Sequence, residues 1–292
     1  MKNKIKIWIL ASRPKTLPAA LAPVFVGTAV AISVSKLNVM AALIALVCSV
    51  LIQIGTNFVN DLYDYLKGTD DENRVGPTRA LAAGWISPNQ MKRAIYFTFG
   101  MTFLLGLYLV YLAGWIILLV GVFSIASGYA YTAGPYPLAY NGLGDVFVFF
   151  FFGIVATVGT YYVQAIEFSM FALLASIPVG LLITNILVVN NYRDADEDKK
   201  KSKNTLAVKF GKSFSLYQYF ISILVSFIVP LYLYFTYCTT LFILLPMLTL
   251  PLAIKLHVDM TRLNGGELNK TLELTAKLSV LYSFLFSIGI IL

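Results

Sequence analysis

Residues 39–60 read VMAALIALVCSVLIQIGTNFVN, and residues 61–64, which follow them, read DLYD. The first stretch contains no Asp, Glu, Lys, Arg or His over 22 residues. A helix of about 20 apolar residues crosses the roughly 30 Å hydrocarbon core of a bilayer. The stretch therefore predicts a transmembrane helix, with two carboxylates, Asp61 and Asp64, at the point where this helix leaves the membrane.

Eight further apolar blocks of similar length occur along the chain. The 292 residues are 59% hydrophobic and 12% charged, with a mean hydropathy of +0.78, whereas a soluble domain carries about 25% charged residues. We therefore expect an all-α, polytopic membrane bundle of about nine transmembrane helices around a central cavity, formed by a single transmembrane domain over residues 1–292. The predicted spans are residues 17–34, 39–60, 94–111, 115–130, 146–163, 168–189, 216–234, 241–256 and 272–292.

The positions of the basic residues predict the orientation of the bundle. If the N-terminus is cytoplasmic, nine spans place 21 of the 22 Lys and Arg residues on the cytoplasmic side, and only Lys36 lies outside. Basic residues are retained in cytoplasmic loops during insertion, so this asymmetry supports an odd number of spans. The net charge of +8 then follows from topology and from contact with anionic lipid, and no nucleic-acid partner is expected.

Acidic residues gather after the second and the sixth span, on the predicted cytoplasmic face. Asn57 and Asp61 in the first group, and Asn190, Asp194 and Asp198 in the second, recur every four residues, so a continuing helix would place each group along one flank. Carboxylates brought together near apolar surroundings repel each other unless a cation neutralises them. Mg2+ prefers oxygen ligands and leaves positions for phosphate oxygens. The spacing predicts Mg2+ and a diphosphate between two cytoplasmic loops, although solvated loop charges are the plain alternative for either group alone.

Both acidic segments resemble the motifs of a known family. Residues 57–70, NFVNDLYDYLKGTD, and residues 191–198, NYRDADED, followed by KNTLAV at 203–208, resemble the two Asp-rich motifs of the UbiA superfamily of membrane prenyltransferases. Four further segments are most similar to the branch that prenylates 1,4-dihydroxy-2-naphthoate in menaquinone synthesis. They are RPKTLP at 13–18, GPTRA at 76–80, YTAGP at 131–135 and NGLGD at 141–145. The resemblance covers nearly the whole chain.

The resemblance implies a Mg2+-dependent aromatic prenyltransferase of a prokaryotic plasma membrane, with its Asp-rich motifs at residues 57–71 and 190–205. The enzyme would transfer a polyprenyl chain from polyprenyl diphosphate to 1,4-dihydroxy-2-naphthoate, releasing diphosphate and CO2 and giving demethylmenaquinol. The isoprenoid tail would lie against the aromatic stretch 147–152. The alternatives are another acceptor, such as 4-hydroxybenzoate, homogentisate, a tetrapyrrole or a glycerol phosphate, and an ion-coupled transporter, which more typically has its acids near the membrane midplane.

The resemblance also assigns roles to individual residues. The Mg2+ ligands, four catalytic acids and one amide, would be Asn60, Asp61, Asp64, Asp194 and Asp198. Three further amides would complete or orient that shell: Asn57, Asn190 and Asn191. The basic residues that bind the diphosphate would be Arg79 and Lys203, with Lys67, Arg74 and Lys199 as further candidates. Two residues would lie near the acceptor: Tyr131 and Asp145.

Two positions depart from the family pattern. Gly68 stands where the superfamily commonly has a third Asp, and Asp70 could take that role with a different geometry. Ser202 stands where the second motif usually has Gly before its Lys. We therefore expect the turns that end the two acidic segments to be where this chain differs from the pattern.

Overall fold

The structure, a computed structural model, describes residues 4–69, 78–237 and 239–292. Every regular element in this part of the chain is helical. Seven helical segments are long and apolar enough to cross a membrane, and two shorter apolar helices accompany them. These nine segments coincide with the nine predicted spans, which confirms the all-α membrane bundle.

The crossing segments follow one another in chain order with short connections. They are α2 (Pro18–Ser33), α3 (Val39–Leu66), α4 (Pro88–Ala113), α5 (Trp115–Ala130), α6 (Gly144–Val148) continuing through the π-helical stretch η2 (Phe149–Val155) into α7 (Ala156–Ala165), α8 (Met170–Lys200), α10 (Lys212–Tyr237), η3 (Leu241–Thr249) with α11 (Leu250–Arg262), and η4 (Gly265–Glu267) with α12 (Leu268–Ile291). Three short helices lie outside these segments: α1 (Lys4–Ala11), η1 (Leu138–Tyr140) and α9 (Leu206–Phe210).

Large apolar side chains cover much of the outer surface of the bundle. Phe97 on α4, Phe123 on α5 and Phe235 on α10 are 71%, 63% and 76% exposed. A soluble protein rarely exposes contiguous apolar surface on this scale, and lipid chains solvate such side chains without cost. The protein is therefore an integral membrane protein.

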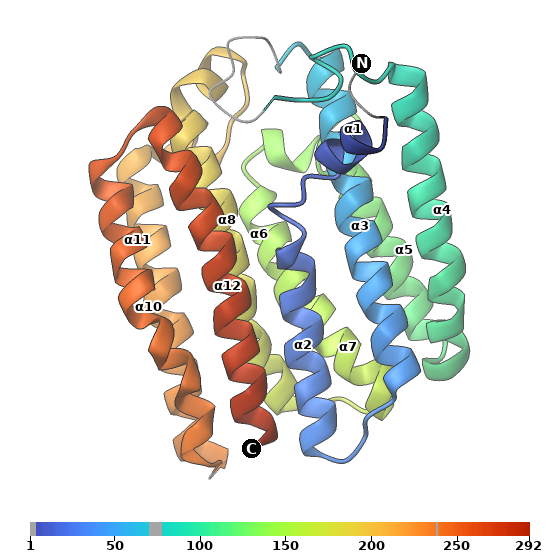
Figure 1. The fold of residues 1–292 in the computed structure, drawn as a ribbon, viewed down its shortest axis with the longest axis vertical. Helices are drawn as coiled ribbons and strands as arrows, with labels where there is room; N and C mark the ends of the chain where they lie inside the picture. The colour runs from blue at the N-terminus through green and yellow to red at the C-terminus, as the bar shows by residue number, and fades with distance from the viewer. Residues whose placement is uncertain (1–3, 70–77, 238) are drawn as a thin grey trace.

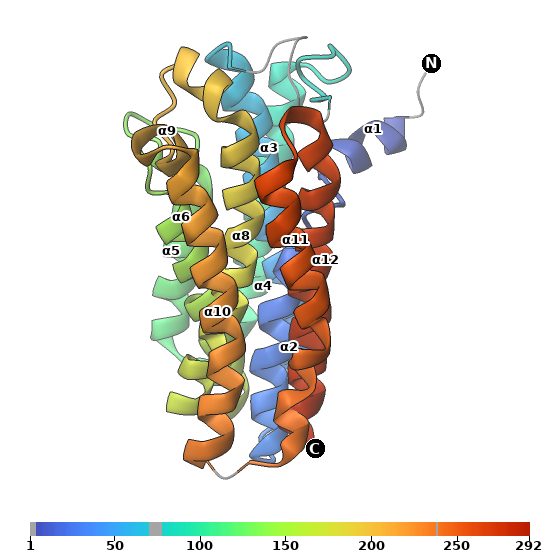
Figure 2. The same cartoon turned by 90° about the vertical axis from the view of Figure 1, so that its left-hand side faces the viewer.

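Two groups of helices flank a central layer (Figure 1). α3, α4 and α5 lie on one side, α10, α11 and α12 lie on the other, and α2, α7 and α8 lie between them. The turned view shows α1 extending sideways from the end that carries the N-terminus (Figure 2). The C-terminus lies at the opposite end, as an odd number of crossings requires.

The largest buried cluster joins α8 to α2, α10, α11 and α12. On its other side α8 approaches η2 very closely, because a Cβ atom on Gly153 would lie 2.6 Å from the Cα of Gly180. Small residues let helices in membranes pack this closely. The contact fixes α8 against the wall of the bundle that α6 and η2 form.

Both acidic segments are helical continuations of spans. α3 and α8 extend past the predicted span ends at residues 60 and 189, to Leu66 and Lys200. Both helices run toward the end of the bundle where the N-terminus lies, so their C-terminal ends share one face (Figure 1). A helix C-terminus carries partial negative charge, which adds to the carboxylates and favours a cation there.

Candidate active site

The two Asp-rich helices end in the same hydrogen-bonded turn. In α3 the amide of Thr69 donates to Asp64 O (2.9 Å) and that of Gly68 to Tyr65 O (3.1 Å). In α8 the amide of Lys203 donates to Asp198 O (2.9 Å), and the amide of the preceding residue donates to Lys199 O (3.4 Å). Both pairs form a Schellman motif. Asp64 and Asp198 therefore occupy equivalent positions, three residues before the helix cap.

The two departures from the family pattern lie at the residue after each cap. Gly68 has φ +69° and Ser202 has φ +55°, so both adopt the left-handed conformation that this position of the motif requires. Gly68 adopts this conformation without steric cost, whereas Ser202 does so at a cost. The turn in the second motif is thus kept in spite of the missing glycine. Asp70 and Arg74 lie outside the described residues.

The acids of the first motif are buried, and residues from another element contact Asp64 and the neighbouring amide Asn60. Asp61 is 1% exposed and Asp64 is 9% exposed. The hydroxyl of Tyr140, in the loop between α5 and α6, donates to Asp64 Oδ1 (2.7 Å). The hydroxyl of Thr132 donates to Asn60 Oδ1 (2.6 Å). The loop between α5 and α6 therefore orients the first motif.

Asn57 lies about one helical turn before Asn60 on α3, and its side chain makes hydrogen bonds to the segment between α1 and α2. Its amide donates to Ser12 O (3.0 Å) and approaches Thr16 Oγ1 (3.4 Å). The guanidinium of Arg13 reaches back to the backbone oxygen of Asn57 (3.5 Å). These contacts tie the segment between α1 and α2 to α3 beside the first motif.

The second motif contains a buried ion pair. Arg193 donates to both carboxylate oxygens of Asp194, at 2.6 and 2.7 Å. The same guanidinium donates to Asn190 Oδ1 (2.9 Å) and to Asn269 Oδ1 on α12 (2.7 Å). Arg193 thereby orders Asp194 and Asn190, two of the predicted site residues. Asn191, a third, is buried beside them.

Asp198 ends the second motif, and Lys203 returns to it. The Lys203 ammonium lies 3.3 Å from Asp198 Oδ1. The other oxygen, Oδ2, is buried and makes no hydrogen bond with any residue that the structure describes. Burying a hydrogen-bond acceptor without a partner costs free energy, and a cation bound to this oxygen would offset that cost.

The predicted basic residues divide into two sets. Arg79 and Lys203 line the cavity described below. Lys199 is exposed and does not line it. Lys67 does not line it either, but its ammonium donates to the backbone oxygen of Thr132 (2.8 Å), a lining residue. Partial burial lowers the pKa of Lys67, and the neighbouring Asp64 acts in the opposite direction.

One cavity of about 730 Å3 connects both motifs with the apolar interior. Its lining along α3 runs from Asp64 to Ala45, a separation of roughly 28 Å at about 1.5 Å per residue. Both residues predicted near the acceptor, Tyr131 and Asp145, line its polar part, and Gln218 donates to Asp145 Oδ1 (3.1 Å).

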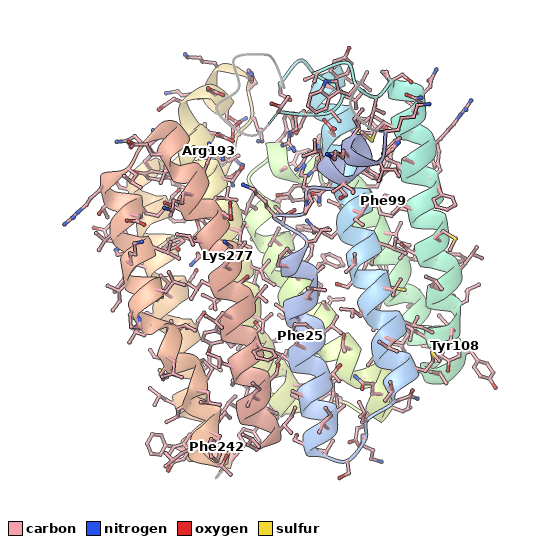
Figure 3. All side chains as sticks on the ribbon, in the orientation of Figure 1. Phe25, Phe99, Tyr108, Arg193, Phe242 and Lys277 are labelled. Carbon is pink, nitrogen blue, oxygen red and sulfur yellow. The ribbon has the colours of Figure 1, made fainter. Side chains whose placement is uncertain are left out.

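The inner end of the cavity is apolar. Its lining there includes Leu109 on α4, Ile117 on α5 and Val163 on α7, which also belong to one buried cluster. Figure 3 labels Arg193 toward the end of the bundle that carries the motifs, and Tyr108 toward the opposite end. The cavity therefore combines a polar mouth with a long apolar interior.

The donor set at the mouth fits Mg2+. Carboxylate and amide oxygens from both motifs line it, and Asp198 Oδ2 offers a buried lone pair without a partner among the described residues. Among the residues that the structure describes, no three His, Cys, Asp or Glu side chains come close enough together to hold one ion by themselves. Mg2+ usually keeps part of its shell for water or phosphate oxygens.

The family follows from comparison with known proteins. A model of the UbiA prenyltransferase family matches residues 20–281. The chain belongs to this family.

Two curated relatives and one solved structure extend the comparison. The chain is 36% identical over 300 residues to the 1,4-dihydroxy-2-naphthoate octaprenyltransferase of Escherichia coli (strain K12), with 99% of this chain and 96% of that protein covered. The protein of the same name from Bacillus subtilis (strain 168) is 30% identical over 288 residues, covering 98% and 92%. A UbiA homolog from Archaeoglobus fulgidus, solved with DMAPP and Mg2+, has the same fold with a TM-score of 0.61 at 17% identity, covering 96% and 99%.

Sequence reasoning missed several residues of this UbiA-family site. Tyr140 and Thr132 contact the first motif from a loop about 70 residues away. Arg193 lies inside the second motif but was counted only among the basic residues that predict the orientation, and adjacent residues on a helix do not ordinarily face each other. Its long side chain nevertheless folds back onto Asp194. The sequence did contain one signal for Tyr140. It is an aromatic residue in a loop rich in Gly and Pro, between two segments that resemble family motifs.

Proposed function

We propose that this UbiA-family protein transfers a polyprenyl chain from its diphosphate to 1,4-dihydroxy-2-naphthoate, with loss of diphosphate and CO2, giving demethylmenaquinol. The observation that carries the proposal is the cavity, which joins two Asp-rich helix ends to an apolar interior of roughly transmembrane length. The names of the relatives from Escherichia coli and Bacillus subtilis support the acceptor.

The polar mouth would bind the diphosphate. Asn60, Asp61, Asp64, Asp194 and Asp198 would hold Mg2+, with Asn57, Asn190 and Asn191 around them. When bound, Mg2+ neutralises the charge of the diphosphate. Lys203 and Arg79 would donate hydrogen bonds to the leaving diphosphate, because fixed cationic donors stabilise charge that develops as a bond breaks.

The bonds that change are few. The allylic C–O bond to the diphosphate breaks, and its electron pair leaves with the diphosphate. The ring carbon that bears the carboxylate forms the new C–C bond, and CO2 departs and leaves its electron pair to the ring. The apolar walls around Phe147 and Phe151 would keep water from the allylic cation, and Tyr131 and Asp145 would orient the acceptor.

The proposal extends to topology and organisation. Residues 1–292 would act as a single transmembrane domain in a prokaryotic plasma membrane, with the N-terminus and both Asp-rich ends cytoplasmic. The basic residues support this orientation, since they gather on one side of the predicted topology. Accessibility of a cysteine introduced at Lys36 to membrane-impermeant reagents in whole cells tests it.

Prenyl transfer by purified protein in detergent tests the reaction. 1,4-Dihydroxy-2-naphthoate and 4-hydroxybenzoate are offered separately with a polyprenyl diphosphate, in Mg2+ or in EDTA. We expect a decarboxylated product from the naphthoate alone and only with Mg2+. Product from 4-hydroxybenzoate alone would mean that the benzoate, and not the naphthoate, is the acceptor. If folded protein gave no product with either acceptor, aromatic prenyl transfer would be refuted.

A matched pair of variants in the second motif tests the site. Asp198 is buried at the cavity, whereas Asp196, two residues earlier, is exposed and paired with Lys212. Asp198→Asn should abolish turnover, and Asp196→Asn should retain most of it. Equal effects would show that net charge in the loop, and not the position of the carboxylate, matters.

A further inference from the structure

Tyr140 contacts both Asp-rich helix ends although it belongs to neither. It lies in η1 (Leu138–Tyr140), in the loop between α5 and α6. Its hydroxyl donates to Asp64 Oδ1 (2.7 Å) and lies 2.9 Å from Thr69 Oγ1. The hydroxyl of Thr69 also donates to the backbone oxygen of Asp64 (2.9 Å). Tyr140 and Thr69 thus contact each other, and each donates a hydrogen bond to Asp64, Tyr140 to the carboxylate and Thr69 to the backbone oxygen.

The ring of Tyr140 lies beside a lysine from each motif. The Lys67 ammonium is 4.2 Å from the ring centre, and the Lys203 ammonium is 5.9 Å from it. Ammonium groups within about 6 Å of an aromatic face are attracted to it. One side chain therefore positions basic groups that follow both α3 and α8.

The backbone of the same loop is fastened to the segment after the second motif. The amide of Asn204 donates to Tyr140 O (2.9 Å), and the Lys209 ammonium donates to Asn141 O (2.7 Å). A Cβ atom on Gly142 would lie 3.1 Å from Asn204 O, so loop and segment are in tight contact. Movement of one Asp-rich end relative to the other would have to break these contacts.

Asp64 accepts a hydrogen bond from the neutral phenol of Tyr140, whereas Asp194 is paired with a cation. Arg193 is a cation, and it neutralises Asp194 through two hydrogen bonds. The phenol of Tyr140 is a neutral donor, so it orients the Asp64 carboxylate without placing a positive charge on it. A neutral donor on one carboxylate oxygen fixes a metal ligand without competing with the metal for its charge.

We propose that Tyr140 is a positioning residue for Mg2+-diphosphate binding, which fixes the Asp64 carboxylate and holds the two Asp-rich helix ends in register. The inference rests on the proposed function, because it assumes that the two motifs bind Mg2+ and a diphosphate. Removing the hydroxyl should weaken Mg2+ binding roughly 10- to 100-fold, as the loss of partners of metal ligands does.

The test uses thermal unfolding of the purified full-length protein, titrated with Mg2+ in the presence of inorganic diphosphate. Tyr140→Phe retains the ring and the backbone contacts but removes the hydroxyl. The matched control is Tyr136→Phe, in the same loop at an exposed position. We expect Tyr140→Phe to need about 10- to 100-fold more Mg2+ for half of the maximal shift in melting temperature, and Tyr136→Phe to match the wild type.

A second variant and a second measurement separate positioning from a general loss of structure. Thr69→Val removes the hydroxyl that contacts both Tyr140 Oη and the backbone oxygen of Asp64, and it should shift the Mg2+ titration in the same direction by a smaller factor. In the transfer assay, turnover by Tyr140→Phe should approach the wild-type rate at saturating Mg2+, since a positioning defect is overcome by mass action.

The outcomes are distinct. Unchanged Mg2+ titrations for both Tyr140→Phe and Thr69→Val, with a clear response of the wild type, would overturn the role of Tyr140 and leave the proposed function standing. A rate of Tyr140→Phe that stays low at every Mg2+ concentration would also overturn the positioning role. No stabilisation of the wild type by Mg2+ and diphosphate would overturn the binding site itself, and the inference with it.

Discussion

Arg193→Met should destabilise the protein far more than Lys212→Met, although both substitutions remove an ion pair of nearly the same length in the same motif. The Arg193–Asp194 distance is 2.6 Å and the Lys212–Asp196 distance is 2.7 Å. The side chains of the first pair are 1% and 8% exposed, and those of the second are 37% and 82% exposed. Burial, and not distance, therefore decides the expected effect.

The magnitudes follow from what each substitution leaves behind. Arg193→Met leaves the Asp194 charge buried without its partner, which costs about 3–5 kcal/mol. Lys212→Met leaves Asp196 in water, where such a pair contributes less than about 1 kcal/mol. At roughly 2–4 °C per kcal/mol, the lower bound for Arg193→Met corresponds to a fall in Tm of about 6–12 °C.

Thermal unfolding of the purified protein in detergent, followed by intrinsic fluorescence, measures both variants under the same conditions. The double variant Arg193→Met/Asp194→Leu adds a check, because removing both charges avoids the uncompensated carboxylate and should recover most of the lost stability. Similar losses for Arg193→Met and Lys212→Met would refute the reasoning, as would a double variant less stable than Arg193→Met alone.

Three further predictions concern glycines and the one serine that takes a glycine's place. Ser202→Gly should stabilise the protein by about 0.5–1 kcal/mol, since Ser202 has φ +55° at the residue after a helix cap; a Tm no higher than that of the wild type would contradict this. Gly153→Leu should lower Tm strongly because its Cβ would lie 2.6 Å from Gly180 Cα, whereas the exposed Gly100, with open space around it, should accept leucine. Gly159 lines the cavity with open space beyond it, so Gly159→Leu should shorten the longest prenyl chain that is transferred, and an unchanged product distribution would place the tail elsewhere.

The membrane fold could be predicted from the sequence because each span satisfies its own requirement. A run such as residues 39–60 partitions into lipid whatever surrounds it, since its backbone hydrogen bonds close within one helix. The placement of Lys and Arg is equally local in origin. For the same reason the turn at Gly114, with φ +84° between α4 and α5, could be predicted from a short break in an apolar run.

The candidate site could be predicted only in part. The spacing of Asn57, Asp61 and Asp64 predicted carboxylates along one flank of a helix, and the structure extends α3 to Leu66 and brings these residues to one cavity. Their roles toward Mg2+ and diphosphate stay predictions. Lys199 belongs to the same basic run as Lys201, yet only Lys201 lines the cavity, because a helix and its final turn direct neighbouring side chains differently.

What the sequence determined by itself is the number of crossings, their lengths and the positions of two acidic helix ends. These depend on hydrophobicity and helix periodicity, which are properties of consecutive residues. The tertiary structure alone decided which groups meet there: Tyr140 with Asp64, Thr132 with Asn60, and Arg193 with Asn269. Such contacts depend on how separate helices and loops pack, and short-range patterns in the chain do not encode the distance between side chains that lie about 70 residues apart in sequence.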